Sequence, residues 1–351
     1  MSTTDRIQPQ DKPILVFTQG DPSGIGPEIL IKVASDPWLP ERCRPLLIIE
    51  KAALEALWVV SPDMDRTRFR VIDRSSIEAD LWSDPDAPVP VVDPGIVSAS
   101  EGRVVYFGKP SADDARGALA ALDFGIELVT AGTETWGCGH ALVTAPLNKA
   151  EIATHVDRSF RGHTDYLAEK AGLTHYGRDY LMAFLAPSLK VALLSTHISL
   201  VEAIEQVKEE KVLDALRCMA KHSEGRIVVA GLDPHVGEGG LIGTRDDEQV
   251  RPAVHRAQRE GIDVSGPESA DSLFARVQRG AYDWVLALYH DQGLIGLKTA
   301  AFGDATNWTL GLPYLRTSVD HGTAYDIAGL NRADASSLRA VVETTLELCA
   351  E

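Results

Sequence analysis

The chain has 351 residues, and its 44% hydrophobic and 24% charged residues are ordinary values for a globular enzyme. Its formal net charge of −17 at pH 7 makes nucleic acids and anionic membranes poor partners. The length predicts two domains, because one small hydrophobic core does not organise so long a chain. The N-terminus is polar and the apolar runs are too short to cross a membrane, so we expect a cytoplasmic protein.

The four cysteines are scattered along the chain, and no pair has the CxxC spacing of a redox or zinc motif. They are Cys43, Cys138, Cys218 and Cys349. This pattern predicts reduced thiols and disfavours both a disulfide framework and a zinc–thiolate site.

Short runs rich in Val, Ile and Leu alternate along the chain with stretches of helical period. Six runs are predicted as buried strands: 14–20, 45–50, 141–146, 191–197, 226–233 and 284–290. Apolar residues three and four apart predict helices over 111–132 and 209–224. The proline-rich patch 82–95 is expected to run over the surface. Apolar strands that alternate with helices predict an α/β fold with helices on both faces of the sheet.

The first predicted strand leads into the stretch GDPSGIGPEILIKVA at 20–34. Its glycines allow a tight turn, and Pro27 suits the first turn of a helix. The stretch is neither the glycine fingerprint of a dinucleotide-binding turn nor a phosphate-binding P-loop. On its own it indicates a structural turn before a helix.

A second helix start is predicted in FRGHTDYLAEKAG at 160–172, where Thr164 or Asp165 could cap the helix. The N–H groups and the dipole at a helix N-terminus also attract anions. His163 and Thr164 are therefore candidate ligands of a phosphate or carboxylate, although capping alone explains the motif equally well.

Three histidines stand at or just beyond the ends of predicted strands: His197 after VALL, His235 after RIVVAGLDP and His290 after WVLALY. Ligands of open α/β sheets bind outside the carboxyl ends of the strands. One such histidine is more often a hydrogen-bonded polar residue than a ligand, but three together leave a metal site and three polar residues as equal alternatives. Neutral imidazoles suit zinc or another borderline divalent ion and leave coordination positions open for substrate oxygens.

The last dense patch surrounds NWTLGLPYLRTSVDHGTAYDIAG at 307–329. Lys298, Asn307 and Arg316 supply two cations and an amide within nineteen residues. This set fits a phosphorylated or carboxylated small molecule, which Arg binds with two parallel hydrogen bonds and Lys as a point charge. Solvated surface side chains are the alternative, which the apolar surroundings disfavour.

Seven motifs, in this order, resemble the 4-hydroxythreonine-4-phosphate dehydrogenase family of vitamin B6 biosynthesis: GDPSGIGPE, TAPLNK, GHTDYLA, STHISL, GLDPHVGEGG, YHDQGL and NWTLGLPYLRTSVDHGTAYDIAG. GIGPE and DHGTAYDIAG are more distantly similar to segments of isocitrate and isopropylmalate dehydrogenases. The resemblance implies two α/β/α domains around a cleft, with residues 11–145 and 300–351 binding the nucleotide. Residues 146–299 would carry the metal, the substrate and the contact of a homodimer that completes the active sites.

The resemblance also assigns roles to individual residues. The metal ligands would be His197, His235 and His290, and the substrate-binding residues His163, Thr164, Lys298, Asn307 and Arg316. One divalent ion per site is expected, zinc first, with cobalt or magnesium as alternatives. NAD would bind against His321 and Asp326, because a carboxylate that accepts from the ribose favours NAD over NADP.

For the catalytic base, Asp271 is the first candidate by resemblance. Asp291 and Lys298 are its rivals. Asp271 could equally cap a helix.

The implied reaction is oxidation of the C3 hydroxyl of 4-phosphooxy-L-threonine to 2-amino-3-oxo-4-phosphooxybutanoate, followed by decarboxylation to 3-amino-2-oxopropyl phosphate, in pyridoxal phosphate biosynthesis. Relatives within the family act instead on a tetronate 4-phosphate or an aromatic cis-diol carboxylate. Asp165 stands where the family usually has Glu, and Asp233 where it often has Asn, which leaves the exact substrate open. A three-histidine metallohydrolase, which needs no dinucleotide, is the alternative from another class.

Overall fold

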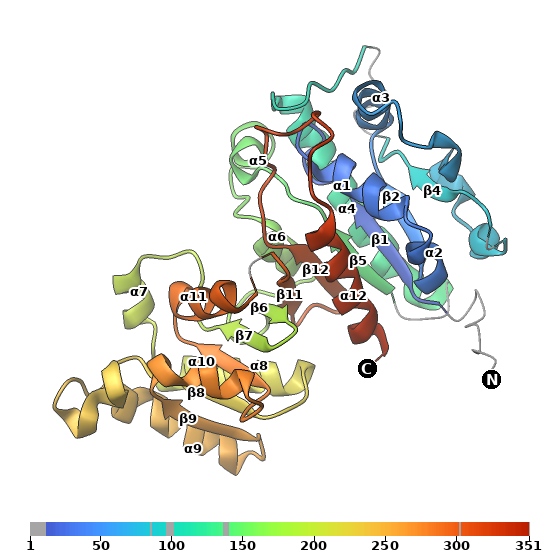
Figure 1. Cartoon of the computed structure of the whole chain (residues 1–351). Coiled ribbons are helices and arrows are strands. Elements are labelled where there is room, and N and C mark those ends of the chain that lie inside the picture. The colour runs from blue at the N-terminus through green and yellow to red at the C-terminus, as the bar shows by residue number, and fades with distance from the viewer. Residues whose placement is uncertain (1–11, 85, 96–101, 136–139, 302, 351) are drawn as a thin grey trace, which may run out of the picture. The chain divides into compact units, whose positions relative to one another are not determined.

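The computed structural model describes residues 12–84, 86–95, 102–135, 140–301 and 303–350 (Figure 1). The chain divides into two compact units: unit 1 is Met1–Tyr166 with Pro313–Glu351, and unit 2 is Leu167–Leu312. The domain limits predicted from sequence were 145/146 and 299/300. The roles predicted for the two domains, nucleotide binding in one and metal and substrate binding in the other, remain predictions.

Unit 1 contains a parallel sheet with strand order β3-β4-β2-β1-β5-β12. Its strands are β1 Ile14–Thr18, β2 Arg44–Ile48, β3 Phe69–Ile72, β4 Val89–Val92, β5 His140–Thr144 and β12 Leu315–Val319. Its helices are α1 Gly26–Ala34, α2 Trp38–Arg42, α3 Lys51–Val60, α4 Ala112–Thr135, α5 Lys149–His155, α12 Ser336–Ala350 and α6 His163–Lys170, whose last turn enters unit 2.

Alternate residues of the unit 1 strands face opposite helical layers, as the side-chain period of two requires. Leu15 and Phe17 of β1 belong to a hydrophobic cluster with residues of α1, α3 and α12. On the other face, α4 approaches so closely that a Cβ at Gly125 would lie 2.8 Å from side chains of Thr18 and Leu142. Helices therefore cover both faces of this sheet, which confirms the predicted α/β class.

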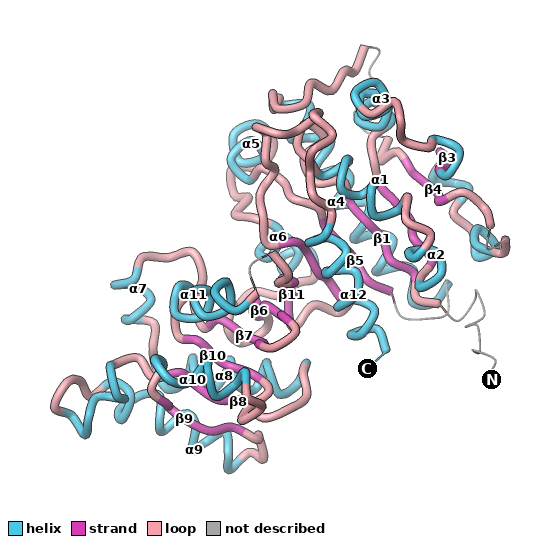
Figure 2. The backbone as a smooth tube through the Cα atoms, viewed as in Figure 1, coloured by secondary structure: helices cyan, strands magenta, loops and turns pink. Residues whose placement is uncertain are grey.

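Unit 2 contains a mixed sheet with strand order β11-β6-β7-β10-β8-β9 (Figure 2). Its strands are β6 Leu181–Ala186, β7 Leu189–Leu193, β8 Ile227–Ala230, β9 Val264–Glu268, β10 Trp284–Ala287 and β11 Thr306–Leu310. The helices are α7 Leu200–Glu205, α8 Glu209–His222, α9 Arg251–Arg259, α10 Ala270–Gln278 and α11 His290–Ala300. The strands β7, β10, β8 and β9 run parallel, whereas β6 is antiparallel to both of its neighbours.

The prediction of a surface linker at 82–95 is wrong for its second half. Val89, Val91 and Val92 are at most 5% exposed and form β4, which pairs with β2 and β3. Pro90 hid the strand, because proline lacks the N–H that an interior strand normally donates. The register with β3 includes Pro90, but the register with β2 begins only at Val91.

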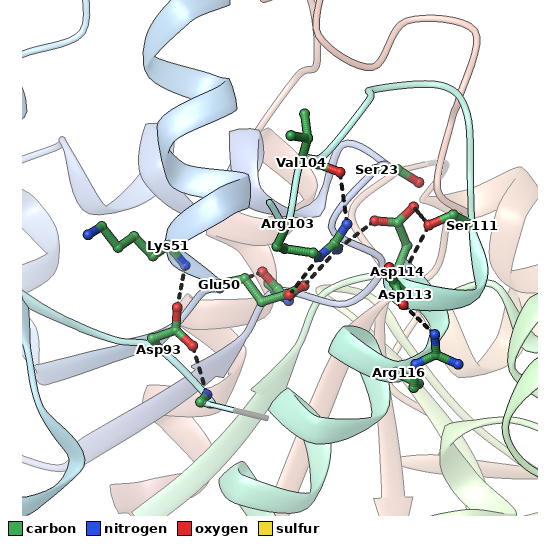
Figure 3. Close-up of polar contacts among 12 residues, drawn as sticks. Ser23, Glu50, Lys51, Asp93, Arg103, Val104, Ser111, Asp113, Asp114 and Arg116 are labelled. Carbon is green, nitrogen blue, oxygen red and sulfur yellow. Dashed lines mark hydrogen bonds and ion pairs between the residues drawn. The ribbon is translucent and has the colours of Figure 1, made fainter. Parts of the chain in front are cut away.

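A buried ion network ties three segments of unit 1 together (Figure 3). Arg103 donates to Asp114 Oδ1 at 2.7 Å and to Glu50 Oε1 at 3.3 Å, and all three side chains are at most 4% exposed. Ser111 Oγ donates to Asp114 Oδ2 at 2.6 Å. A buried arginine between two carboxylates fixes the segment after residue 102 to the carboxyl end of β2 and the start of α4, because breaking such a pair leaves a buried charge uncompensated.

The three cysteines that the structure describes, Cys43, Cys218 and Cys349, form no disulfide, and Cys138 lies outside the described residues. No helix in the described part of the chain is long and apolar enough to span a bilayer.

Candidate active site

His197, His235 and His290 lie beyond the carboxyl ends of β7, β8 and β10. These strands are neighbours in the order β7-β10-β8 and run parallel, so the three histidines follow the same edge of the unit 2 sheet. The strands end earlier than the apolar runs suggested: β7 ends at Leu193 and β10 at Ala287. His290 is therefore the first residue of α11 rather than the last residue of a strand.

The rings of His197 and His290 lie with their centroids 5.4 Å apart and their planes tilted by 45°. Two imidazoles that bind one tetrahedral ion at about 2 Å have ring centres roughly 5 Å apart. Nδ1 of His290 lies 2.7 Å from Oδ1 of Asp291. A carboxylate on one ring nitrogen orients the imidazole and leaves Nε2 as the metal-binding atom.

His235 occupies a left-handed turn within Pro234–Gly240. Its φ is 51°, and Val236 and Glu238 have φ of 57° and 45°. A run of left-handed residues that are not glycine is sterically costly. The buried carboxylate of Asp246 anchors the start of this loop, since it accepts from Leu232 N at 2.9 Å and Asp233 N at 2.8 Å. Strained backbone of this kind is characteristic of functional sites.

Within the described residues of a single chain, no group of three His, Cys, Asp or Glu side chains is arranged to hold a metal ion. The three histidines share one edge of the sheet without forming one cluster. His197 and His290 thus supply two donors of the kind that zinc prefers.

Asp271 lies in the first turn of α10, whose N-cap is Ser269, so Asp271 is not the cap. Ser269 Oγ donates to Asp271 Oδ1 at 2.8 Å and lowers the pKa of that carboxyl, and the nearby His235 lowers it further. Asp271 and Asp291 line the same surface hollow of 480 Å³. Lys298, in the last turn of α11, lines a second hollow of 450 Å³ with His290 and Asp291.

Unit 1 brings His163 and Arg316 together. Arg316, on β12, is 1% exposed and donates from Nη2 to Thr144 Oγ1 at 2.6 Å. Burial lowers the pKa of Arg316 to about 9. Burial, and then the charge of Arg316, lower the pKa of His163 well below 6.5, so this imidazole is neutral at pH 7. A neutral donor beside a buried guanidinium suits a bound anion.

Neither Thr164 nor Asp165 caps α6, although the sequence offered both as caps. The helix begins at His163, so both residues lie in its first turn. Thr164 is buried and Asp165 is exposed. A carboxylate in this turn is stabilised by the helix dipole.

Asn307 lies on β11 in unit 2, and its Oδ1 is buried without a hydrogen-bond partner in the structure. A buried amide oxygen without a partner is costly, so this position favours a donor from a ligand. The predicted substrate residues thus divide between the units, with His163, Thr164 and Arg316 in unit 1 and Lys298 and Asn307 in unit 2.

The predicted cofactor residues, His321 and Asp326, lie in the loop after β12, and Asp326 is exposed. His321 Nδ1 lies 3.1 Å from the carbonyl oxygen of Gly322. This loop packs against the glycine-rich turn after β1: Ile25 N donates to Thr323 O at 3.0 Å. The turn that the sequence indicated as structural therefore supports the predicted cofactor loop.

Together the units form an α/β protein that places imidazoles and carboxylates at the carboxyl edges of parallel strands, as α/β enzymes that bind small ligands do. A family model described as "Pyridoxal phosphate biosynthetic protein PdxA" matches residues 41–345. The chain belongs to this family.

The relatives match along almost the whole chain. The 4-hydroxythreonine-4-phosphate dehydrogenase of Trichlorobacter lovleyi is 36% identical over 97% of this chain and 98% of its own. A protein of Symbiobacterium thermophilum named "Putative D-threonate 4-phosphate dehydrogenase" is 35% identical over 94% of this chain and 95% of its own. The crystal structure of 4-hydroxythreonine-4-phosphate dehydrogenase from Klebsiella pneumoniae has a TM-score of 0.79 and 31% identity, covering 97% of this chain and all of that one.

These relatives confirm the predicted family and the predicted enzyme class, a dehydrogenase. Membership implies a nicotinamide cofactor and a divalent metal ion. The individual site residues remain predictions.

Proposed function

We propose that this chain oxidises the C3 hydroxyl of 4-phosphooxy-L-threonine with NAD⁺. The product, 2-amino-3-oxo-4-phosphooxybutanoate, then loses CO₂ to give 3-amino-2-oxopropyl phosphate, a step of pyridoxal phosphate biosynthesis. The observation that carries the proposal is the full-length match to relatives named for this substrate. The three histidines along one edge of the unit 2 sheet and the buried Arg316 of unit 1 support it.

The metal would be held by His197 and His290 of one chain and by His235 of the partner subunit. The 5.4 Å between the ring centroids of the first pair supports this assignment. When bound, the ion would act as a Lewis acid on the substrate oxygen, both for oxidation and for loss of CO₂. Imidazole donors favour zinc, while cobalt and magnesium remain alternatives.

Exposed apolar side chains follow each of the three candidate histidines of unit 2 within seven residues of sequence and support a homodimer. They are Leu200, Val201, Leu241, Ile242 and Ile295, each at least 51% exposed. Exposed apolar residues are common on interaction surfaces, and most homo-oligomers are twofold dimers. We propose that this surface brings His235 of the partner subunit to the pair on the first chain.

The chain's own side chains would bind the substrate and move its proton. Arg316, His163 and Thr164 would bind the phosphate, and Lys298 with Asn307 the carboxylate, which fixes C3 against the nicotinamide. Asp271, whose pKa is lowered first by the hydrogen bond from Ser269, is ionised at pH 7 and would accept the hydroxyl proton. Asp326 would accept from the ribose hydroxyls of NAD.

A second candidate substrate is D-threonate 4-phosphate, named for the Symbiobacterium relative, which is almost as similar as the first. It keeps the phosphate and carboxylate and has a hydroxyl in place of the amino group. An aromatic cis-diol carboxylate is a third candidate, but it lacks the phosphate that a buried arginine favours.

An assay of NADH formation decides between these substrates. The panel contains 4-phosphooxy-L-threonine, D-threonate 4-phosphate and unphosphorylated L-4-hydroxythreonine, each with and without a chelator. We expect the first to give the highest kcat/KM, the unphosphorylated compound to lose at least about 100-fold, and the chelator to abolish turnover until zinc is restored. Faster turnover of D-threonate 4-phosphate would replace the proposed substrate, and NADH formation that survives full metal removal would exclude the metal.

A further inference from the structure

We propose that Tyr325 and Asp21 act as positioning residues for the cofactor loop, through a hydroxyl–carboxylate contact that joins it to the glycine-rich turn. This inference rests on the proposed function, because it takes residues 321–326 to bind NAD. It concerns two residues that do not belong to the predicted site.

The contact joins loops that follow three neighbouring strands. In unit 1, β1, β5 and β12 are adjacent and parallel, so the loops after them meet at one edge of the sheet. Asp21 follows β1, Asn148 follows β5 and Tyr325 follows β12. The three side chains come from segments up to 304 residues apart in sequence.

Asp21 is 1% exposed, and donors surround both of its oxygens. Oδ1 accepts from Ser23 N at 2.9 Å and Ser23 Oγ at 2.7 Å, and Oδ2 accepts from the Tyr325 hydroxyl at 2.6 Å. Burial raises the pKa of Asp21, whereas the bonds from Tyr325 and Ser23 lower it. The tyrosine hydroxyl thus satisfies a carboxylate oxygen that would be costly to bury alone.

The hydroxyl of Tyr325 has a fixed role in this network. Burial, and then the neighbouring Asp21, raise the pKa of Tyr325, so the hydroxyl stays protonated and donates to the carboxylate. It accepts in turn from Asn148 Nδ2 at 3.0 Å. Asn148 Oδ1 caps α5 through Ala150 N and Glu151 N. The network therefore connects a buried acid, a helix N-terminus and the loop that carries Asp326.

Tyr325 precedes Asp326 in sequence. The hydrogen bond that holds Tyr325 to Asp21 therefore also positions the carboxylate of Asp326. The backbone packing of the loop on the glycine-rich turn, through Ile25 N and Thr323 O, does not depend on the hydroxyl. Removing the hydroxyl should therefore leave the loop folded but less well positioned. The effect should fall on the nucleotide rather than on the phosphorylated substrate.

The test is Tyr325→Phe, with NAD⁺ binding measured by calorimetry without substrate and steady-state kinetics measured alongside. We expect the Kd and the KM for NAD⁺ to rise at least about ten-fold, as for loss of a hydrogen bond to a charged group. The kcat at saturating NAD⁺ and the KM for 4-phosphooxy-L-threonine should change less than about two-fold. Asp21→Asn should weaken NAD⁺ binding as well. The loss of NAD⁺ binding free energy in the double variant should be no larger than the sum of the losses in the two single variants.

Tyr282→Phe is the matched control. Its hydroxyl also donates to a carboxylate, that of Glu268, but in unit 2. We expect it to leave the Kd for NAD⁺ unchanged. If the parent chain binds NAD⁺ and Tyr325→Phe binds it equally well, or loses kcat alone, the positioning role is wrong while the proposed function stands. If the parent chain does not bind NAD⁺, both are wrong.

Discussion

The imidazole of His163 shows how burial decides the charge of a single site residue. It lies beside Arg316, and both burial and that guanidinium oppose its protonation. The folded-state pKa is therefore below the 6.5 of a free imidazole. The stability that a neutral His163 contributes is complete above pH 6.5 and is lost as the pH falls through the lowered value.

The lowered pKa of His163 predicts that the parent chain and the His163→Gln variant differ in how their stability depends on pH. In urea unfolding, the parent chain should lose free energy of unfolding between pH 7.5 and 5.0 more steeply than the variant, by at most about 1.4 kcal/mol per pH unit. Inorganic phosphate should reduce the difference, because a bound anion favours the imidazolium. Parallel pH profiles of the two proteins would show that His163 is not held neutral.

The side chains of Asp21, Glu50 and Arg103 are buried ionisable groups that sequence patterns did not identify. Each is at most 4% exposed and each is ionisable. Composition and spacing did not single them out, because a buried charge is recognised by its partner and not by its neighbours in sequence. Only the motif GDPSG marked the position of Asp21 as unusual.

Among the elements, the turn Pro234–Gly240 is the one that places a predicted ligand, His235, by strained backbone. Gly237 has a φ of 76°, and a Cβ there would lie 2.2 Å from Gly243 O. Gly239 has a φ of 66°, but a Cβ there would meet nothing within 4 Å. The two glycines thus separate the cost of a left-handed residue from the cost of a steric clash.

Gly237→Ala should destabilise the protein far more than Gly239→Ala. We expect about 1 kcal/mol for the second, from the left-handed conformation alone, and at least about 3 kcal/mol for the first, where backbone must move. Urea unfolding followed by tryptophan fluorescence measures both. Equal losses would mean that the turn opens freely and does not hold His235 in place.

Element prediction succeeded for the two long helices of strong apolar periodicity, but several strands were missed, among them β6, whose sequence LMAFLA is apolar and buried throughout. The helix predicted over 111–132 is α4, and the helix predicted over 209–224 is α8. The strand β4 was missed because Pro90 lies within it. The strand β11 was missed because its sequence, TNWTL, has polar residues where a buried strand is normally apolar.

For the whole molecule, a shared metal site makes a prediction about mixed dimers. Chains with His235→Ala and chains with His197→Ala should each be inactive alone. A co-refolded equal mixture should recover roughly a quarter of the parent activity, because about half of the dimers are mixed and each has one complete site.

A mixture of His197→Ala with His290→Ala is the control. Both substitutions fall in the pair contributed by the same chain, so each site of the mixed dimer lacks one ligand. Recovery in this control, or none in the first mixture, would contradict the sharing of ligands between subunits. Zinc content of the purified mixtures gives a second readout.

The sequence by itself determined the α/β class, the family and the identity of the candidate site residues, because strand periodicity and motifs are local properties of the chain. The tertiary structure decided which of these residues meet. It placed Arg316 beside His163, set three histidines along one sheet edge and joined Asp21 to Tyr325 across 304 residues. Those juxtapositions depend on strand order and burial, which arise from packing between distant segments and leave no local pattern.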